Sequence, residues 1–522
     1  MEINKQDKNS REKRPTSAND AAGASGTETK KRFVKNRTGM RSAGSGTGTS
    51  MQATALPERR EKQQASAKRR ETQNFAEYRP NAERKSETPS RRPMRRVQPR
   101  ATEAGAVAAE EKYVRNAKKK RPVKIFFLGG VGEIGKNMTA IEYGGDIIII
   151  DAGITFPNNE DMPGIDLVVP DITYLVKNKD KVKGILLTHG HEDHIGGIPY
   201  LLKELNPGTP VYGTKLTLML ADNKIQEHRI QNVTERVVSP GDKVKLGVFE
   251  VEFINVNHSI SGAVALAVRT PYGLIYHSGD FKIDLTPVAG KPIDLERIAE
   301  LGREGVLLYM GESTNIERLG YTMSETVVGT TLDHLFSENM NRRLIIATFA
   351  SNVHRLQQII DLAVKYRRKV ALSGRSMFKV VDAGVKIGEL KIPEGVLIDI
   401  EKSKNLFDGE LVIVSTGTQG EPMSALTRIA FSNHREIEIQ PGDTVIISAT
   451  PIPGNEKPIY KVINELYRRG AKVYYSALAD VHVSGHASQE EIKLVHALVR
   501  PKFFIPAHGE TRMLYQHAEL AH

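Results

Sequence analysis

Short apolar runs that lead into polar side chains recur along residues 122–325. The runs VKIFFLGG (123–130), GGDIIIIDAG (144–153), GILL (184–187) and LIYHSGDF (274–281) have the length and the β-branched content of buried strands. Each run after the first leads into a histidine or an aspartate. A β-sandwich collects polar residues from the ends of such strands along one edge, so we expect a sandwich with a site at its edge.

From about Met323 the pattern changes to alternating strands and helices. Four apolar runs are each followed by a helical segment, namely 344–348 with 353–365, 369–373 with 378–387, 410–421 with 422–430, and 443–449 with 459–468. This alternation predicts a parallel, helix-covered sheet. A helix over 489–499 and a strand over 502–510 follow. That strand is expected to return to the first domain, which would make the α/β domain an insertion.

Charge and composition set the tail apart from the rest of the chain. Residues 1–121 hold 31 Lys and Arg against 14 Asp and Glu, whereas residues 122–522 hold 43 and 48. The tail has few aliphatic residues and cannot offset its ordering entropy, so we expect it to be disordered. Its basic clusters attract polyphosphate through counterion release. A solubilising or partner-docking role is the alternative, and both stay open.

We expect four segments within an α/β fold. They are a disordered basic tail over 1–121, the first part of a sandwich domain over 122–325, an inserted α/β domain over 326–487 and a returning, apparently incomplete sandwich segment over 488–522.

Several classes of protein are excluded by the sequence. There is no cysteine, so disulfides and thiolate ligands are excluded, and a metal would be held by histidines and carboxylates. No apolar run approaches the ~18–20 residues of a membrane span. The N-terminus lacks the apolar core of a signal peptide. We therefore expect a cytoplasmic protein with no membrane partner.

Gly130, Gly132 and Gly135 form a literal G-x-G-x-x-G. A dinucleotide site requires a helix to begin at these glycines. The residues that follow, KNMTAIEYGGD (136–146), alternate like a hairpin strand instead. We therefore reject a dinucleotide site.

The loop THGHEDH carries the strongest chemical signal. His189, His191, Asp193 and His194 fall within six positions, directly after an apolar strand. Imidazole nitrogen and carboxylate oxygen suit zinc or manganese. The interleaved H-x-H-x-D-H spacing offers one pair of ligands to each of two ions. We favour a metal site over a histidine-rich surface turn.

Further ligand-type residues stand at the ends of predicted strands. His258 follows the strands of 233–257, Asp280 ends 274–281, and His508 stands at the end of 502–510. One histidine and one aspartate at strand ends complete the two sets begun by the loop, so His258 and Asp280 are expected to be metal ligands. His508 stands where a strand edge can reach a metal.

Asp151 closes an apolar strand, where a carboxylate can hold a metal-binding loop from behind. The alternative is a turn aspartate that caps its own loop. His228, His277 and His354 lack such a context and are expected to be structural.

Together these motifs are similar to those of a known family. The residues similar to the metallo-β-lactamase signature are Asp151, His189, His191, Asp193, His194, His258 and Asp280. The residues similar to the further motifs of β-CASP nucleases are Glu312, His486 and His508. The segments GGVGEIGKNM, GDFKID, TFASNVHR, STGTQGEPMSAL, HVSGHAS and PAHGE resemble the bacterial ribonuclease J family across 122–522.

The resemblance implies a metallo-β-lactamase αββα sandwich with an inserted β-CASP domain and two divalent ions, for which zinc is expected and manganese stays open as the alternative. One ion would be held by His189, His191 and His258. The other would be held by Asp193, His194 and His508, with Asp280 bridging both and Asp151 supporting them from behind. The implied catalytic residues are Asp193, His194, Asp280, Glu312 and His486. The implied substrate-binding residues are His482, Val483, Ser484, Gly485 and His486, with Glu312 orienting His486.

The implied activity is hydrolysis of RNA to 5′-phosphate and 3′-hydroxyl products, by 5′→3′ exonuclease and endonuclease action in rRNA processing and mRNA decay. Two divalent ions ~3.5–4 Å apart activate a bridging water and clamp an in-line displacement at phosphorus. His482 and His486 can donate hydrogen bonds to the phosphate oxygens. The group that protonates the leaving oxygen stays open, with His486 as a candidate.

The implied partners are single-stranded RNA with a 5′-monophosphate, a second copy of the chain in a dimer or tetramer, and an RNA-decay complex or the ribosome. Two features depart from the family pattern. Glu312 stands where aspartate is more common, and we expect activity to survive this change. The chain stops at His522, whereas the family normally continues into a small C-terminal domain that aids dimerisation.

Two rival functions are considered. The first is another hydrolase on the same scaffold, such as a thioesterase-like enzyme or a tRNA 3′-processing nuclease. The inserted α/β domain and HVSGHAS argue against it. The second is a non-catalytic RNA-binding scaffold, which would be expected to lose ligand residues, whereas every ligand position here is filled.

Deleting residues 1–120 should reduce the salt sensitivity of RNA binding and spare the cleavage of short substrates, because the basic clusters release counterions on binding. The slope of log K against log salt concentration, measured for both chains, checks this expectation. An unchanged slope would leave the tail without a role in RNA binding.

Overall fold

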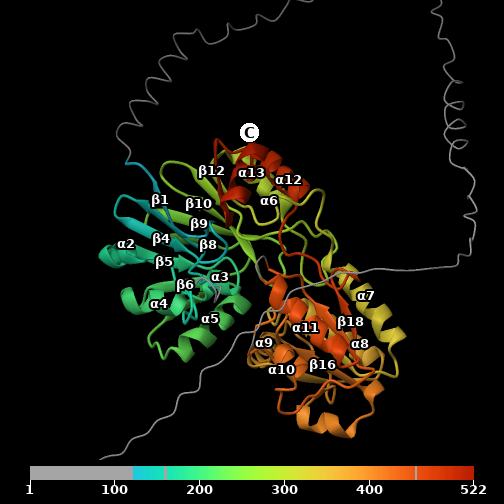
Figure 1. The fold of residues 1–522 in the computed structure, drawn as a ribbon. Helices are drawn as coiled ribbons and strands as arrows, with labels where there is room; N and C mark the ends of the chain where they lie inside the picture. The colour runs from blue at the N-terminus through green and yellow to red at the C-terminus, as the bar shows by residue number, and fades with distance from the viewer. Residues whose placement is uncertain (1–120, 158–161, 422, 453–454) are drawn as a thin grey trace, which may run out of the picture. The chain divides into compact units, whose positions relative to one another are not determined.

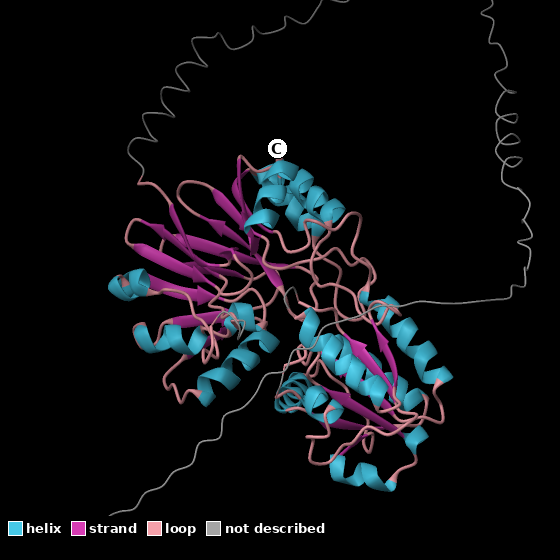
Figure 2. Cartoon of the chain, in the orientation of Figure 1, coloured by secondary structure: helices cyan, strands magenta, loops and turns pink. Residues whose placement is uncertain are grey.

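Three six-stranded sheets and a two-stranded ribbon form the framework of the protein in a computed structural model (Figures 1 and 2). The structure describes residues 121–157, 162–421, 423–452 and 455–522. The disorder predicted for the tail concerns residues that lie outside this part, apart from Arg121. The predicted α/β fold class is confirmed. No helix of the described residues is long and apolar enough to cross a membrane.

The first sheet begins with antiparallel strands and continues with parallel ones. Its strands in spatial order are β1 (Lys124–Gly129), β3 (Met138–Tyr143), β4 (Asp146–Ile150), β5 (Val182–Leu186), β6 (Pro210–Gly213) and β7 (Thr234–Val237). The helices between these strands are α2 (Thr173–Lys177), the 3₁₀ turn η1 (Lys179–Lys181), α3 (Glu192–Ile195), α4 (Ile198–Glu204) and α5 (Lys215–Glu227).

The second sheet combines strands from two distant parts of the chain. Its strands in spatial order are β19 (Phe503–Ala507), β12 (Val306–Glu312), β11 (Leu274–His277), β10 (Val264–Arg269), β9 (Phe249–Asn255) and β8 (Lys243–Leu246). The helices packed on its outer face are α6 (Leu295–Glu304), α12 (Gln489–Val499) and α13 (Thr511–Ala521). A small ribbon pairs β2 (Val131–Gly132) with β20 (Gly509–Glu510).

The first two sheets pack face to face as a sandwich whose outer faces are covered by helices. Strand β4 is buried on both faces, which explains its continuous apolar sequence. Ile148 and Ile150 point into the core between the sheets, whereas Ile147 and Ile149 pack on the helix side. Side chains alternate between the faces of a strand, so a strand buried on both faces reads as a continuous apolar run.

The third sheet is parallel throughout and is covered by helices on both faces. Its strands in spatial order are β15 (Leu397–Ile398), β14 (Lys369–Ser373), β16 (Leu411–Ser415), β13 (Leu344–Thr348), β17 (Thr444–Ser448) and β18 (Lys472–Tyr475). Its helices are α7 (Glu325–Glu338), α8 (Val353–Lys365), α9 (Arg375–Ile387), η2 (Ile400–Asn405), η3 (Asp408–Glu410), α10 (Ala425–Ala430) and α11 (Glu456–Arg468).

The chain returns to the sandwich after the third sheet, as the sequence predicted. Strand β19 lies parallel to β12, and Ala507 is the register partner of Glu312. This pairing places His508, the next residue, beside the end of β12. The domain limits at residues 326 and 488 stay predictions.

Three helices packed on the third sheet begin earlier or later than predicted, among them α11, which begins at Glu456 rather than 459. Helix α9 begins at Arg375 rather than 378, directly after Gly374, whose φ of 118° is open to glycine. Helix α10 begins at Ala425 rather than 422, because the Ser424 side chain caps it by accepting from the Thr427 amide.

The strand predicted after the glycine motif is confirmed. The residues after the G-x-G-x-x-G form β3, which pairs antiparallel with both β1 and β4. The glycines serve close packing instead, since a Cβ on Gly130 would stand 2.2 Å from the Asn137 side chain.

A carboxylate buried on the outer face of the second sheet ties helix α6 to β9 and β10. Glu252 is 3% exposed. Its oxygens accept from Arg297 Nε at 2.7 Å and from Arg269 Nη1 at 2.9 Å. Burial works against ionisation, but the bonds from Arg297 and Arg269 outweigh it and lower the pKa of Glu252 to about 2.

Replacing Glu252 by Gln should destabilise the protein by roughly 2 kcal/mol at pH 7, because it removes the buried negative charge that Arg297 and Arg269 share and leaves them only the exposed carboxylates of Glu300 and Glu304. The folded-state pKa is depressed, so this stability is present above the unfolded pKa of about 4.3 and is lost as the pH falls through about 2. Urea unfolding followed by circular dichroism between pH 7 and pH 2 checks this.

Glu250→Gln is the matched control, because Glu250 lies on the same strand with an exposed side chain 3.9 Å from Arg269. It should change stability by less than about 0.5 kcal/mol. Equal effects of the two substitutions would contradict the role given to Glu252.

Candidate metal centre

Seven side chains converge at one edge of the sandwich. They come from the loop after β5, from the segments after β9 and β11, and from the end of β19. The residues are His189, His191, Asp193, His194, His258, Asp280 and His508. The structure therefore brings together all seven positions that the sequence singled out as metal ligands.

Three imidazoles form the first group. His191 Nδ1 lies 3.1 Å from His189 Nε2 and 3.0 Å from His258 Nε2. Protons on ring nitrogens cannot satisfy three lone pairs that face one another. A cation satisfies all three at once, since ligands ~2.1 Å from one tetrahedral ion stand ~3.4 Å apart. The donor chemistry of this group fits a divalent metal.

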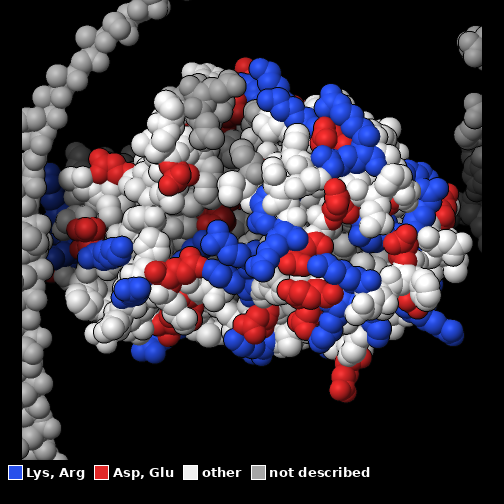
Figure 3. All heavy atoms as spheres, turned by 60° about the horizontal axis from the view of Figure 1, so that its bottom comes forward, with Lys and Arg blue, Asp and Glu red and all other residues white. Residues whose placement is uncertain are grey.

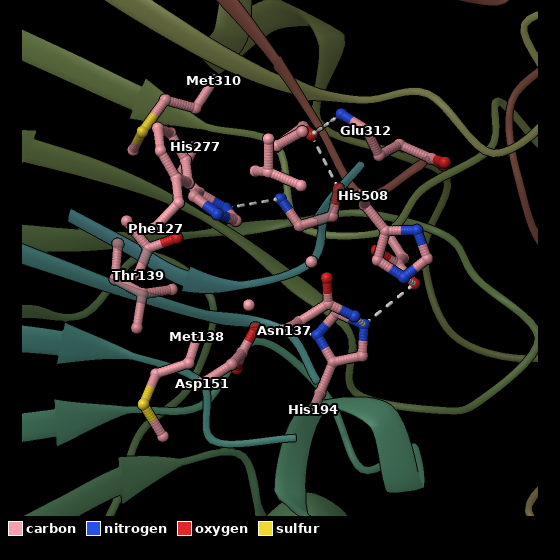
Figure 4. A pocket seen from close by; sticks show the side chains of 18 residues that line it. Phe127, Asn137, Met138, Thr139, Asp151, His194, His277, Met310, Glu312 and His508 are labelled. Atoms are coloured by element: carbon pink, nitrogen blue, oxygen red, sulfur yellow. Dashed lines mark hydrogen bonds and ion pairs between the residues drawn. The ribbon is translucent and has the colours of Figure 1, made fainter. Parts of the chain in front are cut away.

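The second group contains two imidazoles and two carboxylates. His508 Nε2 lies 3.2 Å from Asp193 Oδ2, and His194 Nε2 lies 3.2 Å from Asp280 Oδ2. The rings of His194 and His508 are stacked with centroids 5.2 Å apart (Figure 4). Asp280 Oδ2 also lies 3.6 Å from His189 Nε2, in the first group. One carboxylate oxygen is therefore within reach of both groups.

Asp151 fixes the orientation of two of the histidines. Its carboxylate accepts from His194 Nδ1 at 2.8 Å and from the Thr188 hydroxyl at 2.8 Å. Because the Thr188 proton is directed to Asp151, its lone pair faces His189 Nδ1 at 3.0 Å. Both rings therefore hold their proton on Nδ1 and turn an Nε2 lone pair into the centre.

Two of the other three rings, those of His258 and His508, are held in the same way by contacts that the sequence did not reveal. The Gly485 carbonyl accepts from His258 Nδ1 at 2.7 Å. Thr314 Oγ1 lies 2.6 Å from His508 Nδ1 and donates to the His508 carbonyl, so it accepts from the ring. With Asp151 and Thr188, these contacts fix the Nε2 lone pairs of four histidines toward the centre.

Asn137 is a further residue that sequence reasoning missed. Its Nδ2 lies 3.1 Å from the Asp193 carbonyl, 3.3 Å from Asp193 Oδ2 and 3.1 Å from His194 Nε2. The only sequence signal was its place beside the glycine motif that was rejected as a nucleotide site. Thr188 offered a weaker signal, as the hydroxyl residue before the histidine loop.

Burial and charge prepare the two groups differently. Burial lowers the pKa of His191 to about 4 and holds the pKa values of His189 and His258 well below the usual range. These three rings keep free lone pairs at neutral pH. Burial opposes charge on His194 as well, but Asp280 and Asp193 outweigh it and raise the pKa of His194 well above its usual value.

Glu312 and His486 meet beside the second group. Glu312 stands at the end of β12, and its Oε2 lies 3.1 Å from His486 Nδ1. Burial opposes protonation of His486, but the Glu312 charge and hydrogen bond outweigh it and raise the pKa of His486 to about 9. This contact matches the orienting role that the resemblance implied for Glu312.

The segment from His482 to His486 is held by its neighbours rather than free in solvent. Val483 is buried in an apolar cluster, so its side chain cannot contact a substrate. Ser484 Oγ accepts from Asn315 Nδ2 at 2.8 Å. His482 lies against Arg355 instead of the metal-ligand groups, with Nη1 of the arginine 3.1 Å from its Nδ1.

The three histidines expected to be structural lie outside the two groups. His277 lines the pocket drawn in Figure 4, but its Nδ1 accepts from the Gly279 amide at 3.0 Å. His228 Nδ1 lies 3.4 Å from Lys203 Nζ, beside the ring of Tyr200. His354 is not among the described side chains that could share a metal.

Family models match three successive parts of the chain. Residues 131–297 match the metallo-beta-lactamase superfamily, and residues 341–466 match the beta-CASP domain of ribonuclease J. Residues 471–522 match the Zn-dependent metallo-hydrolase RNA specificity domain.

Curated relatives carry the same similarity across most of the described chain. Ribonuclease J 1 of Streptococcus pyogenes serotype M3 is 46% identical over 404 residues, which are 77% of this chain and 71% of the relative. The chain belongs to the ribonuclease J family. Ribonuclease J of Synechocystis sp. is 47% identical over 401 residues, or 76% of this chain and 62% of the relative. Ribonuclease J of Thermus thermophilus is 46% identical over 398 residues, covering 75% and 69%.

The match to ribonuclease J proteins therefore spans 62% to 71% of the length of these relatives. Among solved structures, a protein of unknown function from Enterococcus faecalis V583 is similar with a TM-score of 0.54. It is 19% identical, and the match covers 76% of this chain and 95% of that one. This likeness shows a shared fold.

Replacing Gly485 by Ala should lower the zinc affinity of the first group by roughly 10- to 100-fold. A Cβ at Gly485 would stand 2.8 Å from the His258 ring and 2.7 Å from Ser259 Oγ, and would displace the carbonyl that orients His258. Competition between the metal-free protein and a zinc-binding dye measures the affinity and the number of sites.

Gly145→Ala is the control, because a Cβ at Gly145 meets no atom within 4 Å. Unchanged zinc affinity in Gly485→Ala would contradict the orienting role of the carbonyl.

Proposed function

We propose that this protein is a metal-dependent ribonuclease that hydrolyses RNA phosphodiesters to 5′-phosphate and 3′-hydroxyl products. The observation that carries the proposal is the convergence of five imidazoles and two carboxylates with four outer ring nitrogens already engaged. Membership of the ribonuclease J family supports RNA as the substrate.

Two divalent cations would be held by the two groups. His189, His191 and His258 would hold one, and the second group would hold the other through Asp193, His194 and His508. Asp280 would bridge both. Nitrogen and oxygen donors without thiolates suit zinc, with manganese as the alternative. When bound, two such ions lower the pKa of a water and draw charge from phosphoryl oxygens.

The chain's own side chains would handle the phosphate. His486 is charged at neutral pH because its pKa is about 9, so it attracts the phosphate and can donate to a phosphoryl oxygen. The same proton is available to the leaving 3′ oxygen. Glu312 keeps the His486 ring in place through Nδ1. His482, Ser484 and Gly485 would line the substrate path as part of one held segment.

Single-stranded RNA with a 5′-monophosphate is the proposed substrate, cleaved by 5′→3′ exonuclease and endonuclease action in rRNA processing and mRNA decay. On the face drawn in Figure 3, basic and acidic side chains are interspersed. The excess of basic residues is in residues 1–121, which would supply long-range attraction to RNA. The protein is proposed to act in the cytoplasm as a dimer or tetramer, within an RNA-decay complex or at the ribosome.

Replacing His189 and Asp193 together by Ala should abolish RNA cleavage and leave RNA binding measurable, because one ligand is removed from each group and the RNA-contacting surface elsewhere is kept. The zinc content of the purified protein, by elemental analysis, should fall along with the activity. Cleavage is assayed on 5′-monophosphorylated and 5′-triphosphorylated RNA, and binding by fluorescence anisotropy.

His334→Ala with Asp382→Ala is the matched control, since both side chains are exposed, at 71% and 63%. It removes the same pair of residue types without touching the centre. Cleavage by the His189/Asp193 variant at the parent rate would contradict the assignment of the metal ligands.

A further inference from the structure

Arg355 is the largest fully buried side chain among the described residues. It belongs to helix α8, in the segment TFASNVHR that the sequence analysis singled out without assigning a role. A buried guanidinium is costly unless all its donors are paired. The partners of Arg355 therefore indicate its role.

Glu325 neutralises Arg355. Its carboxylate accepts from Arg355 Nε at 2.7 Å and from Nη2 at 2.9 Å, a two-bond geometry. Glu325 is the first residue of α7 and is 8% exposed. Arg355 Nη1 donates to the Ser448 carbonyl at the end of β17, at 2.8 Å. The guanidinium is thus held by partners on α7 and β17.

The remaining contact of Arg355 is with His482. Arg355 Nη1 lies 3.1 Å from His482 Nδ1. A guanidinium donates and never accepts, so Nδ1 of the imidazole must be the acceptor. A neutral imidazole that accepts at Nδ1 carries its proton on Nε2. No hydrogen bond to His482 Nε2 occurs within residues 121–157, 162–421, 423–452 and 455–522.

The charged groups around His482 all favour the neutral ring. Burial comes first, and the charges of Arg355, Arg318 and Lys282 add to it, so the pKa of His482 lies well below the usual range. Lys282 is itself paired with Asp284 at 3.2 Å. His486, four residues along, is the opposite case, because the Glu312 carboxylate can only accept from its Nδ1.

We propose that Arg355, neutralised by Glu325, is a positioning residue for RNA cleavage that holds His482 as the Nε2–H tautomer, so that this nitrogen donates to a phosphate oxygen of the RNA. The role rests on the proposed ribonuclease function. It gives the segment from His482 to His486 a donor whose proton position is set by the contact with Arg355. A neutral donor holds a phosphate oxygen without taking part in proton transfer.

The tautomer is tested first on the parent protein with zinc bound. Long-range ¹H–¹⁵N spectra of histidine-labelled protein distinguish a protonated Nε2 from a protonated Nδ1, and the His482→Gln spectrum assigns the signal. The expected result is an Nε2–H signal that does not titrate between pH 6 and pH 9. A protonated Nδ1, or a ring that titrates near 6.5, overturns the proposal.

The kinetic test replaces the buried pair as a whole, by Arg355→Met with Glu325→Gln, so that no buried charge is left unpaired. We expect kcat/KM on RNA to fall about 10- to 100-fold at pH 8. The deficit should shrink below about pH 6.5, where the released imidazole gains a second proton and Nε2 donates again. A ratio of variant to parent that is constant across pH indicates a structural role only and overturns the proposal.

Arg343→Met with Asp443→Asn is the matched control. Arg343 binds Asp443 through Nε at 2.9 Å and Nη2 at 2.6 Å, and this pair does not contact His482. The control pair lies at the starts of β13 and β17. Arg355 follows the other end of β13, and Ser448 ends β17. Replacing the control pair should change kcat/KM less than about two-fold, with melting temperature and zinc content recorded for every variant.

A double-mutant cycle with His482→Gln completes the test, because an amide donor needs no fixed tautomer. The Arg355/Glu325 replacement should cost little in that background. An equal cost in both backgrounds overturns the proposal. A parent protein that does not cleave RNA overturns the proposed function together with this role, whereas a cleaving parent with a constant pH ratio overturns the role of Arg355 alone.

Discussion

The candidate metal centre depends on the groups that hydrogen-bond to the outer ring nitrogens of its histidines. An imidazole can point a lone pair at a cation only when its other nitrogen keeps the proton. Asp151 secures this for His194 directly and for His189 through the Thr188 hydroxyl. The buried carboxylate at the end of β4 thus determines the chemistry of two rings on a loop 38 residues or more along the chain. Its φ of 58° shows that the backbone turns there for this purpose.

The same principle links the centre to the segment after the third sheet. His258 depends on the Gly485 carbonyl, and His508 depends on Thr314, which follows β12. Outer contacts therefore come from parts of the chain that are remote from the rings they hold. Changes in the segment from His482 to His486 are therefore expected to affect the orientation of His258 in the first group.

The sequence pointed to the residues that converge at the candidate metal centre because their pattern is local. His189, His191, Asp193 and His194 share one loop, and Asp280 stands at the end of an apolar run that any strand pattern exposes. The sandwich and the helix-covered sheet could also be predicted, because β4 is apolar on both faces and strands alternate with helices along the third sheet. Helix starts were missed where one residue decides, as at Ser424.

The supporting contacts could not be read from the sequence. The Gly485 carbonyl is a backbone atom present at every position, and only the fold brings it within 2.7 Å of His258 Nδ1. Arg355 is 0% exposed, although nothing in the local sequence of α8 marks it as buried. Its burial follows from packing between α7, β17 and His482, which no local pattern records.

The register of β19 against β12 has a consequence for biosynthesis. His508 reaches the centre only when β19 has paired with β12. Strand β19 is formed by residues near the end of the described chain. A nascent polypeptide that has emerged as far as β18 already presents the histidine loop, but it lacks one nitrogen of the second group. The second group of ligands therefore closes only after the whole inserted sheet has been synthesised and β19 has paired with β12.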